Sequence, residues 1–275
     1  MSAIDYQLGA TILKVSNVSL TLEDRVILRD VNVEIRDIIQ PGRCVGQVSA
    51  LLGPSGVGKT RFFRLLAGLD DPTTGTIVIG EKGEPVERGK VGVVAQDYPL
   101  FPHRTILGNL LIAGRMAGLP AEETRRKADD FLTRFRMQDY AARYPCQLSG
   151  GQRQRVAIAQ QFMCSEHFLL MDEPFSGLDP LAIESVIELI TEVANADELN
   201  TIIVVTHDIS AAIAVADHIW LLGRDRDAEG QPIPGARLQE NYNLLKRGLA
   251  WRKGIQSTPE FQALLTEIRT RFATL

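Results

Sequence analysis

The sequence is poor in features that would cross-link the chain or insert it into a membrane. Its three cysteines are widely spaced and include no C-x-x-C pair, so neither a disulfide framework nor a zinc site is indicated. No apolar run reaches the roughly 18 residues that a membrane-spanning helix requires. The formal charge of −4 gives no overall basic surface, which argues against a protein that holds nucleic acid mainly through phosphate contacts.

The beginning of the chain also lacks the pattern of a secretory signal. Residues 1–10 include the acidic Asp5 and no apolar stretch. We therefore expect a cytoplasmic chain, for which any role at a membrane has to come through a partner. The composition is otherwise that of an ordinary globular protein, and 275 residues suffice for one α/β core with a smaller subdomain.

The pattern of apolar residues predicts an α/β fold with parallel core strands. The first third of the chain is rich in Val, Ile and Leu between polar turns, whereas 105–135 has helical periodicity. Two short apolar runs, at 168–171 and 201–207, end in polar residues as buried parallel strands do. The other predicted elements are strands at 11–20, 26–35, 48–52, 76–79 and 91–95, and helices at 60–69, from Pro180 onward and at 259–272.

We predict a single domain over residues 1–275. The core, which includes an N-terminal antiparallel β subdomain, covers 11–96 and 166–222. A helical subdomain is inserted at about 97–165, and a C-terminal extension covers 223–275. Two segments are expected to be irregular. The polar stretch 224–235, with its two prolines, predicts an exposed loop, and 36–47 predicts an unusual surface loop.

A glycine-rich segment carries the strongest chemical signal. It satisfies the pattern G-x-x-x-x-G-K-[ST], follows an apolar strand and opens a helix, as a phosphate-binding loop must; elsewhere it would be only a glycine-rich turn. In such a loop, backbone N–H groups approach the phosphates, the lysine reaches the terminal phosphates, and the last hydroxyl ligates Mg²⁺. The candidate nucleotide-binding residues of this core are Gly53, Pro54, Ser55, Gly56, Val57, Gly58, Lys59, Thr60 and Arg61.

Two adjacent carboxylates close the predicted strand at 168–171. Ligands of open α/β sheets bind at the carboxyl ends of the strands, which is where Asp172 and Glu173 stand. Successive strand residues point to opposite faces, so Asp172 can serve a magnesium ion while Glu173 faces the water that attacks the terminal phosphate. Alone, such a pair is most often a turn or a helix cap, and its combination with the phosphate loop favours the catalytic interpretation.

The segment from Leu148 to Gln152 narrows the class of protein. It precedes a helical pattern and forms a second helix N-terminus with exposed amides, although a capped helix after a Ser-Gly-Gly loop is common by itself. Here the sequence resembles the ABC ATPase family, over roughly 12–222 and with the motifs in family order. The resemblance implies a head-to-tail dimer, expected to be a homodimer, in which this segment faces the nucleotide of the second ATPase subunit. The segment's candidate nucleotide-binding residues are Ser149, Gly150, Gly151 and Gln152.

Three further residues match family positions one by one. Gln96 follows a predicted strand, where the family has a glutamine that touches the magnesium site and senses the permease. Asp179 matches the loop that crosses the dimer interface, or else belongs to a simple turn. His207 matches the histidine that contacts the terminal phosphate and orients Glu173, although a lone histidine is usually structural. The candidate catalytic residues are therefore Glu173, His207 and Gln96, and the candidate magnesium ligands are Thr60, Gln96 and Asp172.

The resemblance implies an ATP-hydrolysing transporter subunit at the inner face of the cell membrane. ATP and Mg²⁺ are the expected cofactors. A second ATPase subunit and transmembrane permease subunits are the expected partners, a substrate-binding protein is a further one, and no nucleic acid is expected. The segment 97–104 is expected to receive a short permease helix through Tyr98, Leu100 and Phe101, unless these side chains are buried within the subdomain.

Other functions are less compatible with the sequence. A soluble ABC ATPase of DNA repair or translation, the main alternative, would carry coiled-coil or zinc inserts or tandem ATPase halves, and none is present. A module that holds ATP without turnover would lack Glu173 or His207. A phosphotransferase resembling adenylate kinase would not need 148–152.

Two residues depart from the family pattern. Leu22 stands where the family usually has an aromatic side chain on adenine, and base–aromatic stacking contributes about 1–3 kcal/mol per base in nucleic-acid complexes, so we expect weaker or less selective binding. Arg61 replaces a small hydroxyl residue. Import is favoured because an ATPase on a chain separate from its permease is commoner among bacterial importers, although it occurs in exporters as well. The residues after Leu222 are too few for the regulatory β-barrel of many sugar-type importer ATPases, and the C-terminal helix resembles nitrate, sulfonate and taurine importer subunits.

Overall fold

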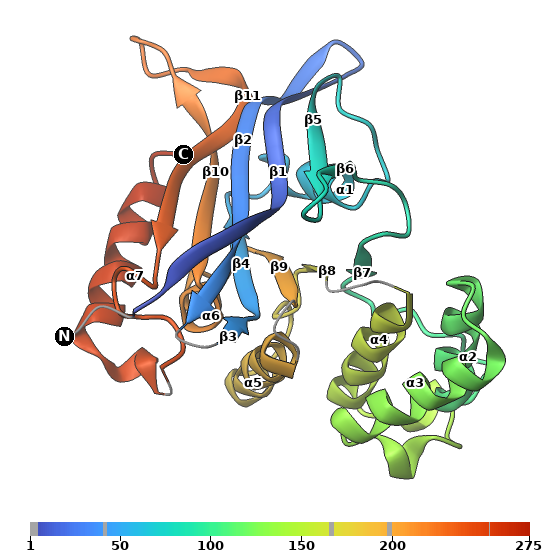
Figure 1. The fold of residues 1–275 in the computed structure, drawn as a ribbon. Helices are drawn as coiled ribbons and strands as arrows, with labels where there is room; N and C mark the ends of the chain where they lie inside the picture. The colour runs from blue at the N-terminus through green and yellow to red at the C-terminus, as the bar shows by residue number, and fades with distance from the viewer. Residues whose placement is uncertain (1–4, 41–42, 165–167, 197–199, 253) are drawn as a thin grey trace.

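A curled sheet, built from strands of both ends of the chain, forms the centre of the molecule (Figure 1). This computed structural model describes residues 5–40, 43–164, 168–196, 200–252 and 254–275. Within them the strands are β1 (Gln7–Leu22), β2 (Arg25–Gln40), β3 (Arg43–Val45), β4 (Gln47–Leu52), β5 (Thr74–Ile79), β6 (Glu84–Pro85), β7 (Gly92–Val94), β8 (Phe168–Asp172), β9 (Thr201–Thr206), β10 (His218–Arg226) and β11 (Pro232–Asn243). Their order across the sheet is β6-β5-β1-β2-β11-β10-β4-β9-β8-β7, and β3 pairs with β2.

The sheet has a parallel half and an antiparallel half, as the sequence predicts. β10, β4, β9, β8 and β7 are parallel neighbours, whereas β1 pairs antiparallel with both β2 and β5. β11 joins the halves, because it runs antiparallel to β10 and meets β2 in parallel at the pair Ala236–Leu28. The predicted boundary between 222 and 223 falls inside β10, and the predicted boundary at 165–166 lies outside the described residues.

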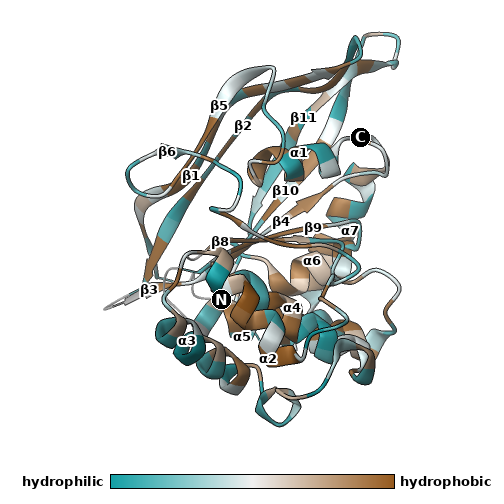
Figure 2. Ribbon diagram, turned by 90° about the vertical axis from the view of Figure 1, so that its right-hand side faces the viewer, coloured by the Kyte–Doolittle hydropathy of each residue, from teal (hydrophilic) through white to brown (hydrophobic). Residues whose placement is uncertain are grey.

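The helices divide between the sheet and a separate group. They are α1 (Lys59–Leu66), α2 (Ile106–Met116), α3 (Ala121–Arg134), α4 (Gly150–Cys164), α5 (Pro180–Ala196), α6 (Ile209–Val215) and α7 (Pro259–Phe272), with short 3-10 turns at Gln138–Tyr140, Pro145–Gln147 and Ile255–Ser257. Figure 1 shows α2, α3 and α4 grouped beside the β7 and β8 edge, as the predicted helical insertion requires. In Figure 2 the hydrophobic colouring concentrates on the central strands, while α3 is largely hydrophilic.

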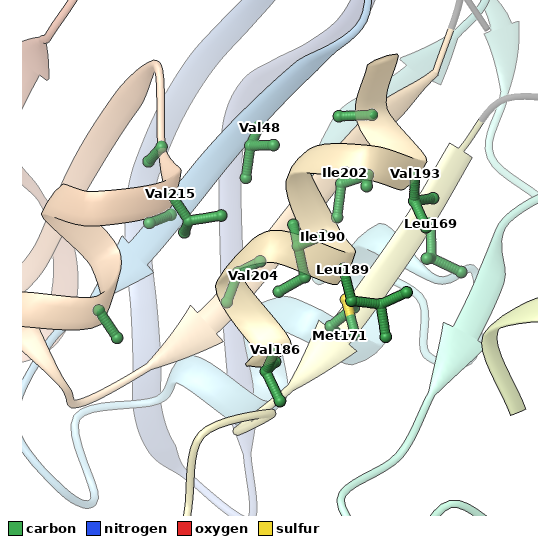
Figure 3. Close-up of a cluster of buried hydrophobic side chains, with 14 of the residues drawn as sticks. Val48, Leu169, Met171, Val186, Leu189, Ile190, Val193, Ile202, Val204 and Val215 are labelled. Atoms are coloured by element: carbon green, nitrogen blue, oxygen red, sulfur yellow. The ribbon is translucent and has the colours of Figure 1, made fainter. Parts of the chain in front are cut away.

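Two buried clusters fix the strands that carry the candidate site. One cluster contains side chains of α5 together with those of β8 and β9, among them Leu189, Met171 and Val204 (Figure 3). The other lies between α1 and the curled antiparallel strands, and Phe62 and Leu28 are fully buried in it. Burying one such side chain contributes about 1.5–3 kcal/mol, so both faces of the parallel half are held firmly.

The prediction of a surface loop at 36–47, which rested on the length of this segment, is wrong for the part that the structure describes, namely 36–40 and 43–47. β2 continues through Gln40, and β3 turns back to pair with it at Ile38–Val45 and Ile39–Cys44. Ile38 is fully buried, and Asp37 is 9% exposed. Burial, with a smaller contribution from the charge of Glu81, raises the pKa of Asp37. A buried aspartate therefore interrupts the apolar alternation by which a strand is normally predicted.

The prediction of a loop at 224–235 is also wrong, because most of this segment belongs to the hairpin of β10 and β11. Only its turn is irregular, where the Asp227 carboxylate accepts hydrogen bonds from the backbone N–H groups of Glu229 and Gln231. The strand residues are polar because they pair across the sheet: Arg237 Nε lies 2.8 Å from the Asp225 carboxylate. The C-terminal helix, by contrast, forms at 259–272 as predicted and buries Phe261, Leu264, Leu265 and Ile268.

Candidate active site

Three adjacent strand ends bring most of the predicted residues to one edge of the sheet. β9 lies between β4 and β8, and the registers pair Leu52 with Thr206 and Asp172 with Val205. The phosphate loop after β4, the carboxylates at the end of β8 and the histidine after β9 therefore stand together. Gln96 lies in the exposed turn after β7, the next strand beyond β8.

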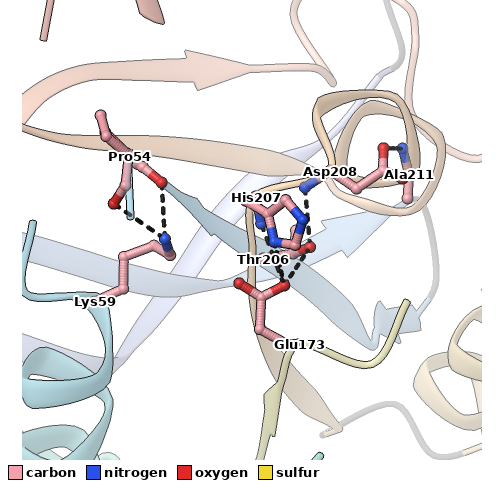
Figure 4. A network of polar contacts seen from close by, with 8 residues as sticks. Pro54, Lys59, Glu173, Thr206, His207, Asp208 and Ala211 are labelled. Atoms are coloured by element: carbon pink, nitrogen blue, oxygen red, sulfur yellow. Dashed lines mark hydrogen bonds and ion pairs between the residues drawn. The ribbon is translucent and has the colours of Figure 1, made fainter. Parts of the chain in front are cut away.

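The phosphate loop depends on glycine at two positions. Gly56 and Gly58 have φ values of 74° and 117°, which a residue with a side chain rarely adopts. A Cβ at Gly58 would also lie 3.2 Å from the Ile27 side chain. The Lys59 ammonium donates hydrogen bonds to the carbonyl oxygens of Gly53 at 2.7 Å and Pro54 at 3.2 Å (Figure 4). The loop thus delivers a fixed cation and the amide groups of the α1 N-terminus to the same place.

The charges beside the loop act on one another. Burial lowers the pKa of Lys59, and the carboxylates of Glu173 and Asp172 oppose that shift. Burial also raises the pKa of Asp172; the charge of Glu173 adds to this effect and the charge of Lys59 counters it. Two carboxylates thus share one nearby ammonium, and the negative charge left over favours a bound cation.

The donor set at this edge fits magnesium. Asp172 offers a carboxylate, Thr60 a hydroxyl and Gln96 an amide oxygen, and Mg²⁺ prefers such oxygen ligands. Within the described part of the chain, no group of three or more His, Cys, Asp or Glu residues could hold a metal ion. Magnesium is commonly held by one or two carboxylates together with water and substrate phosphates, so an all-protein cage is not required.

Glu173 is held by contacts to the end of β9. Its Oε2 atom accepts hydrogen bonds from Thr206 Oγ1 at 3.2 Å and from the His207 amide at 3.4 Å, and it lies 2.8 Å from His207 Nδ1 (Figure 4). The Glu173 backbone has a φ of 48°, a conformation that costs about 1–3 kcal/mol in a residue other than glycine. The Glu173 side chain is 19% exposed and that of His207 58%, so the pair is fixed yet reachable by water.

Thr206 is a site residue that the sequence motifs did not identify. Its hydroxyl donates to Glu173 Oε2 and accepts a hydrogen bond of 3.1 Å from the Asp208 amide. Asp208 in turn caps α6 by accepting from the Ala211 amide at 2.9 Å. A usable signal was present, because Thr206 is a hydroxyl residue at the polar end of a buried strand, directly before the histidine that the motifs did select.

The segment at Ser149 makes a different kind of structure. The Gln152 side chain accepts from the Ser149 amide at 3.0 Å, and the Ser149 hydroxyl accepts from the Gln152 amide at 3.3 Å. This reciprocal pair is a capping box at the start of α4. Ser149, Gly150 and Gly151 are exposed, and a Cβ added at either glycine would meet nothing within 4 Å. The helix N-terminus therefore presents an open, amide-rich surface.

Asp179 has a local role as well. Its carboxylate accepts hydrogen bonds of 3.0 Å from the amides of Leu181 and Ala182, which caps α5. The Leu181 side chain beside it is 77% exposed. These contacts alone account for a capping residue at position 179, which is exposed.

Two residues that depart from the family pattern have identifiable surroundings. Arg61 Nη1 lies 3.6 Å from the Asp70 carboxylate, which Arg64 holds with two bonds of 2.7 Å. Arg61 thus belongs to an ion-pair cluster between α1 and the turn that follows it. Leu22 ends β1 and packs, partly buried, against the cluster around Leu28.

The fold and the site together define a phosphate-loop nucleotide-binding protein with a carboxylate–histidine pair beside the loop. Residues 44–176 match the family model described as ABC transporter. The chain is 36% identical to the sulfate/thiosulfate import ATP-binding protein CysA of Mesorhizobium japonicum, over 78% of this chain and 61% of the relative. It is also 36% identical to the spermidine/putrescine import ATP-binding protein PotA of Lawsonia intracellularis, over 85% of this chain and 61% of the relative. The chain contains an ABC transporter ATP-binding domain, as its motifs predict.

A solved structure supports the same assignment. CbiO1 of Clostridium perfringens, described as part of the ABC transporter complex cbiONQ, superimposes with a TM-score of 0.73 at 26% identity. The match covers 94% of this chain and 99% of that one. The curated relatives are longer, and the chain spans about three fifths of their length.

Proposed function

We propose that the chain is an ATP-hydrolysing subunit of an ABC transporter. The observation that carries this proposal is the contact of Glu173 with His207, 2.8 Å apart beside the phosphate loop. A carboxylate fixed in this way is placed to accept the proton of an attacking water, and general-base catalysis contributes about 10²- to 10⁴-fold to a rate. A module that only holds nucleotide has no need of this pair.

The other site residues take roles that follow from their positions. The amides of 53–58 and the ammonium of Lys59 bind the phosphates, while Thr60, Asp172 and Gln96 hold Mg²⁺. The metal ion supplies charge neutralisation on the phosphate oxygens. His207 orients Glu173 and contacts the terminal phosphate. Catalysis then rests on placement and fixed charge, without a covalent intermediate.

The amide-rich start of α4 supports a dimeric mechanism. In our proposal Ser149, Gly150, Gly151 and Gln152 bind the terminal phosphate held by the second subunit, and Asp179 links the two sites. Since only the closed dimer gains these contacts, ATP favours closure through its higher affinity for that state. Hydrolysis removes the shared phosphate and allows the dimer to reopen.

The segment 97–104 is the surface that we propose for the permease. Phe101 is 42% exposed there, whereas Tyr98 and Leu100 are partly buried against the core, so Phe101 is the apolar side chain available for docking. In the described part of the chain no helix has the length and hydrophobicity needed to span a bilayer. In our proposal the chain lies on the cytoplasmic face of the membrane, bound to permease subunits, with a substrate-binding protein as a further component.

Import is the direction that the relatives favour. CysA and PotA are both named as import ATP-binding proteins, although their names give chemically different cargoes, an inorganic anion and a polyamine. This difference suits an ATPase subunit that leaves the choice of cargo to its partners. We accordingly propose import without assigning a substrate.

The Glu173→Gln variant tests the proposal. It should bind ATP, hydrolyse it at least about 10²-fold more slowly and accumulate as a closed dimer. The variant is purified from native membranes with ATP and Mg²⁺, and the proteins that accompany it are identified by mass spectrometry. Glu188→Gln, an equivalent change at an exposed position of α5, is the control.

Two outcomes separate the candidate functions. Recovery of a polytopic membrane protein, more abundant with Glu173→Gln than with the control, supports the transporter subunit. An ATP-dependent dimer that brings only soluble partners contradicts it and favours a soluble ABC ATPase.

A further inference from the structure

Tyr98 adopts a backbone conformation that aromatic residues rarely show. It lies two residues after Gln96, its amide donates to the Ala95 carbonyl at 3.0 Å, and its φ is 46°. Such a conformation persists in a bulky residue only where the surrounding structure enforces it. The ring does not point freely into solvent, because it is partly buried and packs against the main hydrophobic cluster.

The Tyr98 hydroxyl reaches the turn that carries the catalytic carboxylate. It donates a hydrogen bond of 3.2 Å to the carbonyl oxygen of Pro174, which follows Glu173 directly and is buried. Burial raises the pKa of Tyr98 to about 12, so the hydroxyl keeps its proton throughout the physiological range. One hydrogen bond thus joins two turns, each of which contains a left-handed residue other than glycine.

This bond acts on Glu173 from the side opposite to His207. β8 lies between β9 and β7, and the contacts of the Glu173 side chain come from residues that end or follow β9. Tyr98 belongs to the segment after β7. The left-handed turn at Glu173 is therefore held from both neighbouring strands.

The segment that follows Tyr98 is hydrogen-bonded to helix α2 of the helical subdomain. Asn109 on α2 is fully buried, and its side chain accepts from the Phe101 amide at 2.7 Å and donates to the carbonyl oxygens of Phe101, Arg104 and Thr105. A displacement of α2 would move this segment, and the Tyr98 hydroxyl would carry the movement to the turn at Pro174.

We propose that Tyr98 is a positioning residue that sets the backbone of Glu173 through Pro174 and couples it to the position of α2. This inference rests on the proposed function, since it concerns the same catalytic carboxylate. It assigns to Tyr98 an intramolecular role, in place of the direct permease contact that its sequence position suggested.

The Tyr98→Phe variant, which keeps the ring and removes the hydroxyl, tests the inference in the full chain. We expect kcat for ATP hydrolysis to fall about 3- to 10-fold, the effect of one lost neutral hydrogen bond, while KM for ATP stays within about twofold. Amide hydrogen exchange should quicken in peptides covering 96–101 and 172–177 together. Tyr140→Phe, a partly buried tyrosine of the same subdomain, is the control.

A double-mutant cycle separates positioning from general destabilisation. In a Glu173→Gln background Tyr98→Phe should leave the residual turnover unchanged, because the residue that it positions is already altered. An unchanged kcat, or exchange that quickens at 96–101 but not at 172–177, overturns the inference. If the wild-type chain hydrolyses no ATP, the proposed function fails, while the exchange data still decide whether Tyr98 holds the turn at Pro174.

Discussion

The two predicted halves of the nucleotide site differ in how they are held. The half at Lys59 and Glu173 is assembled by contacts between distant segments: Glu173 bonds to residues more than 30 positions away, at the end of another strand. The half at Ser149 is bonded within its own first turn, through the reciprocal contacts of Ser149 and Gln152. The first half is a finished arrangement, whereas the second is a preformed helix N-terminus open to solvent.

This difference is informative about the mechanism. A capping box fixes the backbone but uses only some of the four amide groups that a helix N-terminus leaves unpaired. The exposed amides near Gly150 and Gly151 can still bind an anion. A site whose second half lies on another subdomain, and bonds only to itself, is suited to completion by a second copy of the chain.

Complementation between two inactive variants gives the largest expected effect. Lys59→Ala should lower turnover by about 10²- to 10³-fold by removing a charge that stabilises the transition state. Ser149→Asp should lower it comparably by placing a negative charge against the terminal phosphate. Mixing the two purified variants should restore ATP hydrolysis, since half of a freely exchanged dimer population is mixed and each mixed dimer has one intact site. About a quarter of wild-type turnover is therefore expected, because half of the dimers are mixed and one of the two sites in each of them is intact.

The control for complementation is a mixture in which no intact site can form. Chains that each carry both Lys59→Ala and Ser149→Asp are mixed with Lys59→Ala chains, and turnover should stay at background. Restored activity in this control, or no restoration in the complementing mixture after verified subunit exchange, would show that the two halves do not come from different chains.

Ser149 variants can separate capping from phosphate contact. Asp, Asn and Ser are comparable N-cap residues, so Ser149→Asp and Ser149→Asn should keep the free energy of unfolding within about 0.5 kcal/mol of wild type. Only Ser149→Asp introduces a charge, and only it should abolish turnover, while ATP binding to the Lys59 half is retained. Thermal unfolding, nucleotide binding and steady-state ATPase activity measure the three quantities. Equal turnover of the two variants would leave Ser149 with the capping role alone.

The sequence predicted β4, β8 and β9 of the parallel half because buried strands appear in the sequence as uninterrupted apolar runs. β4, β8 and β9 are almost completely buried, and residues that the motifs selected lie at the end of each strand or directly after it. The failures share another physical cause. β2 continues through the buried Asp37, and β10 and β11 carry charged residues that pair across the sheet, as Arg237 does with Asp225. Because the partner of each charged residue lies elsewhere in the sequence, a short stretch of sequence gives no indication that these residues belong to strands.

In the candidate site, too, the sequence predicted the residues that follow from local geometry and not those that depend on tertiary contacts. Glycine positions and the carboxylate pair follow from local geometry, so the motifs located them. The motifs did not identify Thr206, because its role depends on a tertiary contact with Glu173. The sequence left open whether Tyr98 is buried or faces a partner, because this depends on tertiary contacts such as the one with Pro174. No local pattern in the sequence indicates that Tyr98 has a left-handed φ.

Substitution of Asp179 is expected to have the smallest effect on turnover. It tests directly whether this residue also acts at a dimer interface, because its role as the cap of α5 is already visible in the structure. The carboxylate accepts from the amides of Leu181 and Ala182, a task that the side-chain oxygen of asparagine performs equally well. Asp179→Asn should therefore keep the stability of the chain, whereas Asp179→Ala should cost about 1 kcal/mol. If Asp179 also links the two sites of a dimer, removal of its charge should lower turnover about 3- to 10-fold in the Asn variant without changing its unfolding temperature. Wild-type turnover in Asp179→Asn would confine the residue to capping α5, and the interface would then have to be formed by the start of α4 alone.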